Sequence, residues 1–180
     1  MPAYVALLRA VNLAGFAQVR MSDLQACLSA ARFENVRTLL PSGNVVFRSD
    51  TGRPIVIEQQ IERAIAASLG LRTEVFVRTK AEWGGIMAQN PFPREALRDP
   101  SHLTVLVLKE APPDRAWAEL QSTITGRELV RGLGRHGYVT YPDGIGRSRL
   151  TPKRLERALG TRGTTRNWNT VTKLGSLVAQ

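Results

Sequence analysis

Basic side chains gather towards the end of this 180-residue chain. Residues 147–173 hold eight arginines and lysines and a single acid, Glu156, whereas the first eighty residues hold ten basic and six acidic residues. Guanidinium and ammonium groups at this density favour anionic partners. The basic segment therefore predicts a binding site for a phosphate-bearing ligand or for nucleic acid. The residues expected to bind it are Arg147, Ser148, Arg149, Lys153, Arg154, Arg166 and Asn167.

Two glycines precede the basic segment, in the run Gly144-Ile145-Gly146. The run lacks the third glycine of a dinucleotide-binding loop, and it lacks the Gly-Lys-Ser/Thr ending of a Walker loop. It can still form a nest of backbone N–H groups that binds an anion beside the arginines. The alternative is a tight loop that only joins a strand to a helix, and the sequence favours neither.

A second group of polar residues lies in two turns of the first half. The loop at residues 12–20 follows the first predicted strand, and the turn at 41–44 joins the next two strands. In the expected sheet both connections lie at the same end, where the first helix begins with unpaired N–H groups. The residues that could line a polar site there are Asn12, Gln18, Arg20, Ser42 and Asn44. The preferred interpretation is that the asparagines satisfy turn backbone, because asparagine is common in turns; a small-molecule enzyme site is the alternative.

The run Thr-Thr-Arg-Asn-Trp-Asn at residues 164–169 is unusually polar for the start of a helix. We expect Thr164 or Thr165 to cap the last helix and Trp168 to anchor it in the core. Arg166 and Asn167 then have two interpretations. They tie this helix to loops of the first half, or they line a site.

Residues typical of catalysis are sparse. No spacing of histidines and cysteines matches a metal site, so we expect no metal, and no motif calls for a cofactor. Cys27 lies on an apolar helical stripe, as an inert core residue would. Asp143 is the best-placed carboxylate near the basic segment, but no acid partner accompanies it. The sequence therefore leaves enzymatic activity undecided.

The elements that must position these residues alternate between strand and helix. Apolar runs predict strands at 3–11, 36–40, 44–48 and 73–78. A capping box from Ser22 predicts the first helix, and Gly70 closes the second. The resulting βαββαβ order is that of a ferredoxin-like half.

The second half partly echoes the first. We expect a helix opened by a Thr79–Glu82 capping box, a buried strand at 103–108 and a helix after Pro113. Strands at 127–131 and 138–141, a helix that ends at Gly160 and a last helix from Trp168 follow. The prediction is an α+β protein with a ferredoxin-like subdomain at 1–80 and a second α+β subdomain at 81–180.

The composition excludes several classes of protein. No apolar run approaches the roughly 20 residues of a membrane span, and no basic flank precedes the first apolar stretch. A single cysteine excludes an intrachain disulfide. A cytoplasmic protein that does not bind membranes is therefore expected, and its oligomeric state stays open.

Three segments of the sequence together resemble a known bacterial family. They are YVALLRAVNLAGFAQVRMSDLQACL, VRTLLPSGNVVF and GIGRSRLTPKRLERALGTRGTTRNWNTVTKL. In these segments the chain is similar to domain of unknown function 1697. The resemblance implies an α+β fold with a ferredoxin-like first half, and it implies no particular activity.

Overall fold

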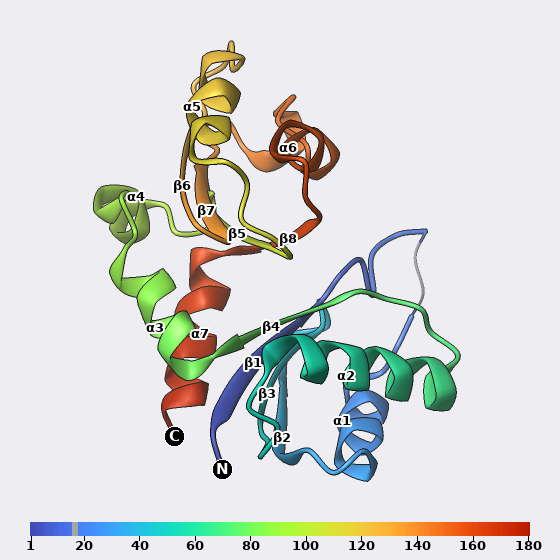
Figure 1. Cartoon of the computed structure of the whole chain (residues 1–180). Helices are drawn as coiled ribbons and strands as arrows, with labels where there is room; N and C mark the ends of the chain where they lie inside the picture. The colour runs from blue at the N-terminus through green and yellow to red at the C-terminus, as the bar shows by residue number, and fades with distance from the viewer. Residues whose placement is uncertain (16–17) are drawn as a thin grey trace. The chain divides into compact units, whose positions relative to one another are not determined.

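The computed structural model describes residues 1–15 and 18–180 (Figure 1). Residues 16–17, inside the loop that the sequence suggested for a polar site, lie outside the described residues. Two antiparallel four-stranded sheets and the helices beside them form an α+β fold, as predicted. None of the described helices is long and apolar enough to cross a membrane.

The first sheet has the strand order β2-β3-β1-β4. The elements, in chain order, are β1 (Ala3–Leu8), α1 (Met21–Ala30), β2 (Glu34–Leu39), β3 (Asn44–Arg48), α2 (Pro54–Leu69) and β4 (Val75–Thr79), followed by α3 (Lys80–Ala88). The predicted βαββαβ order is confirmed. Strand β1 occupies the middle of the sheet with β3 and β4 antiparallel on its two sides, which explains its nearly continuous apolar sequence.

The second sheet repeats this plan in the order β6-β7-β5-β8. After α4 (Pro93–Arg98) come β5 (Leu103–Leu108), α5 (Asp114–Ser122), β6 (Leu129–Leu133), β7 (His136–Thr140), the 3₁₀ turn η1 (Ile145–Arg147), α6 (Pro152–Leu159) and β8 (Gly163–Asn167), followed by α7 (Trp168–Ala179). Each repeat thus ends in a strand that runs directly into a helix, β4 into α3 and β8 into α7. The fold is a tandem repeat of one βαββαβα plan.

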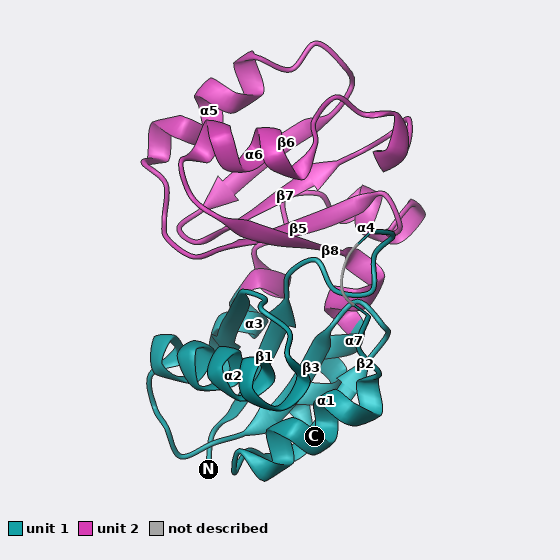
Figure 2. Ribbon diagram, turned by 90° about the vertical axis from the view of Figure 1, so that its right-hand side faces the viewer, with its two compact units in different colours: residues 1–85, 173–180 teal, residues 86–172 magenta. Residues whose placement is uncertain are grey.

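Two compact units divide the chain, and Figure 2 colours them separately. Unit 1 comprises residues 1–85 and 173–180, and unit 2 comprises residues 86–172. The boundaries fall inside α3 and inside α7. The division into domains at 1–80 and 81–180 stays a prediction.

Each unit buries its own apolar core on a sheet. In unit 1 the apolar stripes of α1 and α2, with Leu24, Leu28 and Ile61, pack with Tyr4 and Phe47 of the sheet. In unit 2 Trp117 and Leu120 of α5 and Leu155 and Leu159 of α6 pack with β5, represented by Leu106. Burial of each such side chain stabilises the fold by about 1.5–3 kcal/mol.

A pair of glycines makes room for Trp117. Gly132 and Gly137 face each other across the β6–β7 hairpin. A Cβ would lie 2.0 Å from the indole at Gly132 and 2.5 Å from it at Gly137. The indole therefore lies against bare backbone. This close approach explains why a glycine, Gly132, stands inside β6. The sequence predicted that the strand would end at residue 131 and that a turn would follow at 132–134. In the structure the strand continues to Leu133, and the turn lies at Gly134 and Arg135.

Several predicted helix ends are confirmed. Thr79 and Glu82 form the expected reciprocal capping box, in which the Glu82 N–H donates to Thr79 Oγ1 (3.1 Å) and the Thr79 N–H donates to Glu82 Oε2 (2.8 Å). Gly70 and Gly160 end α2 and α6 in the left-handed conformation, with φ of 64° and 67°. In contrast, the capping box from Ser22 is wrong. Helix α1 begins at Met21, and its N-cap Arg20 makes no side-chain capping bond.

The structure also corrects the expected start of the last helix. Thr164 and Thr165 do not cap it, because they belong to β8, which pairs with β5. Asn167 is the cap, since its Oδ1 accepts from both the N–H and the hydroxyl of Thr170 at 3.0 Å. Trp168 is half-buried and is not a full core anchor. The β-branched threonines fit a strand, and pairing with β5 outweighs their capping preference.

Candidate functional site

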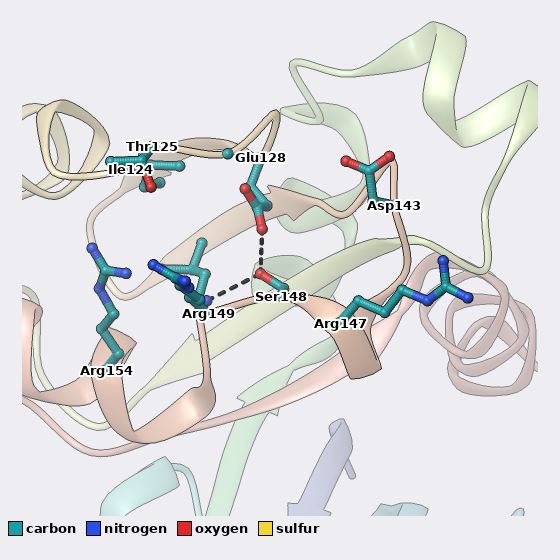
Figure 3. Close-up of a pocket in the computed structure, with 10 residues that line it drawn as sticks. Ile124, Thr125, Glu128, Asp143, Arg147, Ser148, Arg149 and Arg154 are labelled. Carbon is teal, nitrogen blue, oxygen red and sulfur yellow. Dashed lines mark hydrogen bonds between the residues drawn. The ribbon is translucent and has the colours of Figure 1, made fainter.

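A hollow of about 240 Å³ in unit 2 brings together most of the predicted phosphate-binding residues (Figure 3). Its lining comes from the loop between α5 and β6, from the segment around η1, and from α6. The lining residues are Ile124, Thr125, Gly126, Glu128, Asp143, Arg147, Ser148, Arg149, Leu150 and Arg154. In Figure 3 Arg154 lies on one side, Asp143 and Arg147 lie on the other, and Glu128 and Ser148 lie between them.

Buried and partly buried hydrogen bonds fix the segment that carries Arg147 and Arg149. Gly144 turns the chain with a φ of 89°, which glycine adopts readily. The Tyr141 hydroxyl donates to the Leu150 carbonyl (3.1 Å), and the Leu150 N–H donates to Ser148 Oγ (3.0 Å). The Ser148 hydroxyl in turn donates to Glu128 Oε1. The segment is therefore tied to the core at Tyr141 and to the loop before β6 at Glu128.

Two backbone N–H groups of the proposed nest are used inside the turn itself. The Arg147 N–H donates to the Gly144 carbonyl (3.3 Å), and the Ser148 N–H donates to the Ile145 carbonyl (3.2 Å). These bonds form the 3₁₀ turn η1. Of the two interpretations of the glycine run, the geometry fits a tight connecting turn, and side chains carry the positive charge of the hollow.

The three arginines of the hollow are held to different degrees. Arg154 is half-buried, and its Nη2 donates to the Thr123 carbonyl (2.9 Å) and hydroxyl (3.2 Å). Arg147 and Arg149 are exposed, and neither guanidinium group makes a hydrogen bond or an ion pair with the described residues. Lys153 is exposed as well and does not belong to the lining. Two guanidinium groups thus remain available to a ligand beside a third that is already oriented.

Two carboxylates share the hollow with the arginines. Asp143 forms an ion pair with Arg127 (Nη2 to Oδ1, 2.9 Å), while Glu128 contacts Ser148. Burial raises the pKa of Tyr141 to about 12, and the negative charge of Glu128 contributes in the same direction. Sequence reasoning missed Glu128, because it lies 20 residues before Ser148 and only the β6–β7 hairpin brings the two together.

Arg166 and Asn167 lie on β8 and do not line this hollow. Arg166 is only 8% exposed, and its Nη1 donates to the Thr164 hydroxyl and the Thr165 carbonyl, both at 2.8 Å. Burial lowers its pKa to about 10, so the guanidinium stays charged at neutral pH. Asn167 caps α7. Their suggested role in joining the two halves stays a prediction.

The other predicted site, in unit 1, is built largely from residues that hold the backbone. Asn12 Nδ2 donates to the carbonyls of Val19 (2.8 Å) and Pro41 (2.7 Å), and its Oδ1 accepts from the Val19 N–H (2.7 Å). Asn44 is fully buried and donates to the Leu39 carbonyl (2.7 Å) and to Ser42 Oγ (2.9 Å). The preferred interpretation of both asparagines as turn-stabilising residues agrees with these bonds.

Gln18 and Arg20 lie beside Asn12 in a shallow hollow of about 380 Å³, together with Val19, Asp23 and Leu69. Ser42 and Asn44 are not part of its lining. The structure thus brings together three of the five residues predicted for this site. Across the described residues, no group of three or more His, Cys, Asp or Glu side chains is placed to hold a metal ion.

Comparisons with known proteins identify a family and a fold. A family model described as "Protein of unknown function (DUF1697)" matches residues 1–138, which end before the basic turn. No curated protein matches the chain. A solved structure, described as the conserved bacterial protein SP0830 from Streptococcus pneumoniae, is similar over 100% of this chain and 99% of that one, with a TM-score of 0.76 and 19% identity. At this identity the likeness shows the fold alone.

Proposed function

The chain belongs to the DUF1697 family of unknown function, and we propose that it binds a small phosphate-bearing ligand in the hollow of unit 2. The guanidinium groups of Arg147, Arg149 and Arg154 hold the phosphate. The observation that carries the proposal is that all three arginines line one hollow, and that the side chains of Arg147 and Arg149 have no partner among the described residues. Guanidinium groups bind phosphate oxygens through two parallel N–H donors, with both charge and geometry in their favour.

A similar turn in unit 1 has an acidic residue at the position of Arg149. There the Thr51 N–H donates to Ser49 Oγ (3.1 Å), and the Tyr4 hydroxyl donates to the Thr51 carbonyl (2.9 Å). In unit 2 Leu150, Ser148 and Tyr141 make the same two bonds. The residue between the serine and the bonded residue is Asp50 in unit 1 and Arg149 in unit 2. The same turn therefore forms with a negative or a positive side chain at this position. Because the turn does not require an arginine, a binding role for Arg149 is supported.

The size and lining of the hollow favour a small ligand over nucleic acid. A volume of about 240 Å³ is below the roughly 300–1,000 Å³ of sites for drug-sized ligands. Glu128 and Asp143 also line it, and carboxylates repel a continuous phosphate backbone. Binding of single-stranded nucleic acid through the wider basic segment, which includes Lys153, is the competing outcome that the experiment must distinguish.

The test compares two variants that each lose three positive charges from unit 2. One is Arg147→Ala/Arg149→Ala/Arg154→Ala. The matched control is Arg94→Ala/Arg98→Ala/Arg115→Ala, which changes arginines outside the hollow. Thermal unfolding is followed with inorganic phosphate, sugar phosphates, nucleotides and a single-stranded oligonucleotide, because a ligand that binds the native state raises apparent stability.

We expect a small phosphate compound to stabilise the parent and the control, and not the variant of the hollow. A ligand at 100 times its Kd adds about 2.7 kcal/mol to the free energy of unfolding. Equal stabilisation of all three proteins contradicts the proposal. A different result indicates a non-specific surface for polyanions. In that case only the oligonucleotide binds, and its affinity falls equally in both variants and falls with added salt.

A further inference from the structure

Glu128 is an unexpected neighbour for three arginines. Its Oε1 accepts from the Ser148 hydroxyl, and Glu128 forms no ion pair with the described residues. Its other oxygen, Oε2, has no hydrogen-bond partner among them. A carboxylate at an anion site repels the phosphate that the arginines attract. If the hollow bound its ligand through negative charge alone, its affinity would be higher without Glu128.

The surrounding residues hold this carboxylate in place. The Ser148 hydroxyl, itself fixed by the Leu150 N–H, binds one oxygen. On the other side Gly126 leaves the space that Oε2 occupies, because a Cβ at residue 126 would lie 2.1 Å from that oxygen. The hydrogen bond from Ser148 therefore holds Oε1, and the missing side chain at residue 126 leaves room for Oε2.

We propose that Glu128 selects a ligand that carries hydroxyl groups as well as phosphate, a phosphorylated polyol such as a sugar phosphate. This inference rests on the proposed function, in which the arginines take the phosphate. The free Oε2 of Glu128 accepts a hydrogen bond from a ligand hydroxyl, and hydrogen bonds to a charged acceptor are about twice as strong as neutral ones. The carboxylate weakens the binding of a phosphate ligand without hydroxyls, since no hydrogen bond to Oε2 then offsets the repulsion.

The selectivity can be measured with two probes that differ only in hydroxyl groups. Glycerol 1-phosphate carries two hydroxyls, and propyl phosphate carries none. Their dissociation constants are obtained from NMR titrations of backbone amide signals, which suit millimolar affinities and report whether residues 126–128 and 147–150 respond. The proteins are the parent, Glu128→Gln and the control Glu119→Gln, whose acid lies on the exposed side of α5 next to Arg115.

We expect the parent and the control to bind glycerol 1-phosphate about tenfold more tightly than propyl phosphate, as one charged hydrogen bond predicts. In Glu128→Gln the two affinities converge, and propyl phosphate binds more tightly than to the parent because the repulsive charge is gone. Glutamine keeps an oxygen for Ser148, so the turn retains its attachment.

Two results overturn the inference, and they are distinguishable. If both probes bind equally to the parent, or if their ratio is unchanged in Glu128→Gln, the hydroxyl selection is wrong while phosphate binding stands. If neither probe shifts the signals of the hollow, or if Arg147→Ala/Arg149→Ala/Arg154→Ala binds both as the parent does, the proposed function fails and the selection fails with it.

Discussion

Gly126 and Glu128 illustrate how single residues set the properties of the hollow. The arginines could be predicted from the sequence because they cluster within eight positions, from 147 to 154. Glu128 could not, because its importance comes from tertiary contact with Ser148. The importance of Gly126 could not be predicted either. Its φ is one that any residue can adopt, and only its lack of a Cβ matters. Sequence reasoning finds residues that act together when they are close in the chain.

We expect Gly126→Ala to weaken the binding of glycerol 1-phosphate without weakening the fold. The new methyl group would displace the Glu128 carboxylate, whose Oε2 lies 2.1 Å from the Cβ position. The carboxylate is the end of a flexible side chain, so the free energy of unfolding should change by less than about 0.5 kcal/mol. Gly146→Ala is the control, because no atom lies within 4 Å of its Cβ position. Urea melts and probe titrations of both variants test this, and equal affinities would contradict it.

Two buried tyrosines should make unit 2 sensitive to alkaline pH. Burial raises the pKa of Tyr138 and of Tyr141 to about 12. In the unfolded chain both ionise near pH 10, so between about pH 10 and 12 the folded state holds more protons. Stability therefore falls as pH rises through this range. Arg166 acts in the opposite direction, because its pKa is lowered to about 10.

The double variant Tyr138→Phe/Tyr141→Phe isolates the contribution of the tyrosines. It should flatten the alkaline loss of stability by at most about 1.4 kcal/mol per pH unit for each tyrosine. At neutral pH it should be less stable, because the hydroxyls donate to the Ile86 and Leu150 carbonyls. Denaturant melts between pH 8 and 11 measure both effects. An alkaline slope equal to that of the parent would argue against this account.

At the scale of elements, glutamate side chains on helices accept hydrogen bonds from one edge strand of each sheet. Strand β4 is an edge strand, and the N–H groups of Val75 and Val77 donate to Glu62 Oε1 (2.9 Å) and Glu58 Oε1 (2.8 Å) of α2. In the second repeat Glu156 of α6 accepts from the Gly163 N–H of β8 (2.9 Å). The acceptors satisfy backbone donors that an edge strand otherwise leaves open to pairing with another chain.

Replacing Glu156 tests whether this cap stabilises β8. Glu156→Ala should lower the free energy of unfolding by about 1–3 kcal/mol, because it removes the acceptor of a partly buried N–H. Glu156→Gln keeps an oxygen in the same place and should cost clearly less. Guanidinium melts of the two variants provide the comparison. If both variants lose the same free energy of unfolding, Glu156 contributes through its charge and not through its hydrogen bond to the Gly163 N–H.

Asn167 provides a second test at this scale. Asn167→Ala should cost about 1 kcal/mol, as the loss of a helix N-cap does. Asn167→Asp should be neutral or stabilising, because a carboxylate also accepts from Thr170 and interacts favourably with the helix dipole. Thermal melts distinguish the two. If Asn167→Ala leaves the stability unchanged, Asn167 does not stabilise the helix as its cap.

Most elements could be predicted, and those missed have identifiable physical reasons. Strand β5 and the Thr79–Glu82 cap follow directly from apolar runs and capping chemistry. Strand β8 could not be predicted, because its sequence, Gly-Thr-Thr-Arg-Asn, has no apolar alternation. It becomes a strand by pairing with β5. Helix α4 was missed although Pro93 stands at its first turn, a position that proline favours.

At the scale of the whole molecule, the final helix of each repeat is divided between the two units. Helix α3 follows β4 of the first repeat, yet from Ile86 onwards it belongs to unit 2, where the Tyr138 hydroxyl donates to the Ile86 carbonyl (2.6 Å). Helix α7 follows β8, yet from Lys173 onwards it belongs to unit 1, where Lys80 Nζ donates to the Ala179 carbonyl (3.2 Å). The sequence suggested an echo between the halves but did not indicate that either helix would be divided.

Leu174→Ala tests which unit depends on the end of α7. Leu174 is fully buried, and the substitution should cost about 2–5 kcal/mol. Hydrogen exchange should accelerate in β1 and β3 of unit 1 more than in β5 and β7 of unit 2. Lys173→Ala, at an exposed position one residue earlier, is the control. Faster exchange confined to β5 and β7 would contradict the assignment of residues 173–180 to unit 1.

The division of unit 1 between residues 1–85 and 173–180 has a consequence for biosynthesis. A ribosome that adds about 5–20 residues per second needs about 4–17 s to translate the 87 residues of unit 2 that intervene. During that interval Leu177 and Val178, which lie beside Ala3 and Val46 in the folded protein, do not yet exist. Synthesis of unit 1 therefore starts before that of unit 2 but ends after it. The earliest sheet of the nascent chain stays partly uncovered while the rest is translated, and this is when a chaperone would be most useful.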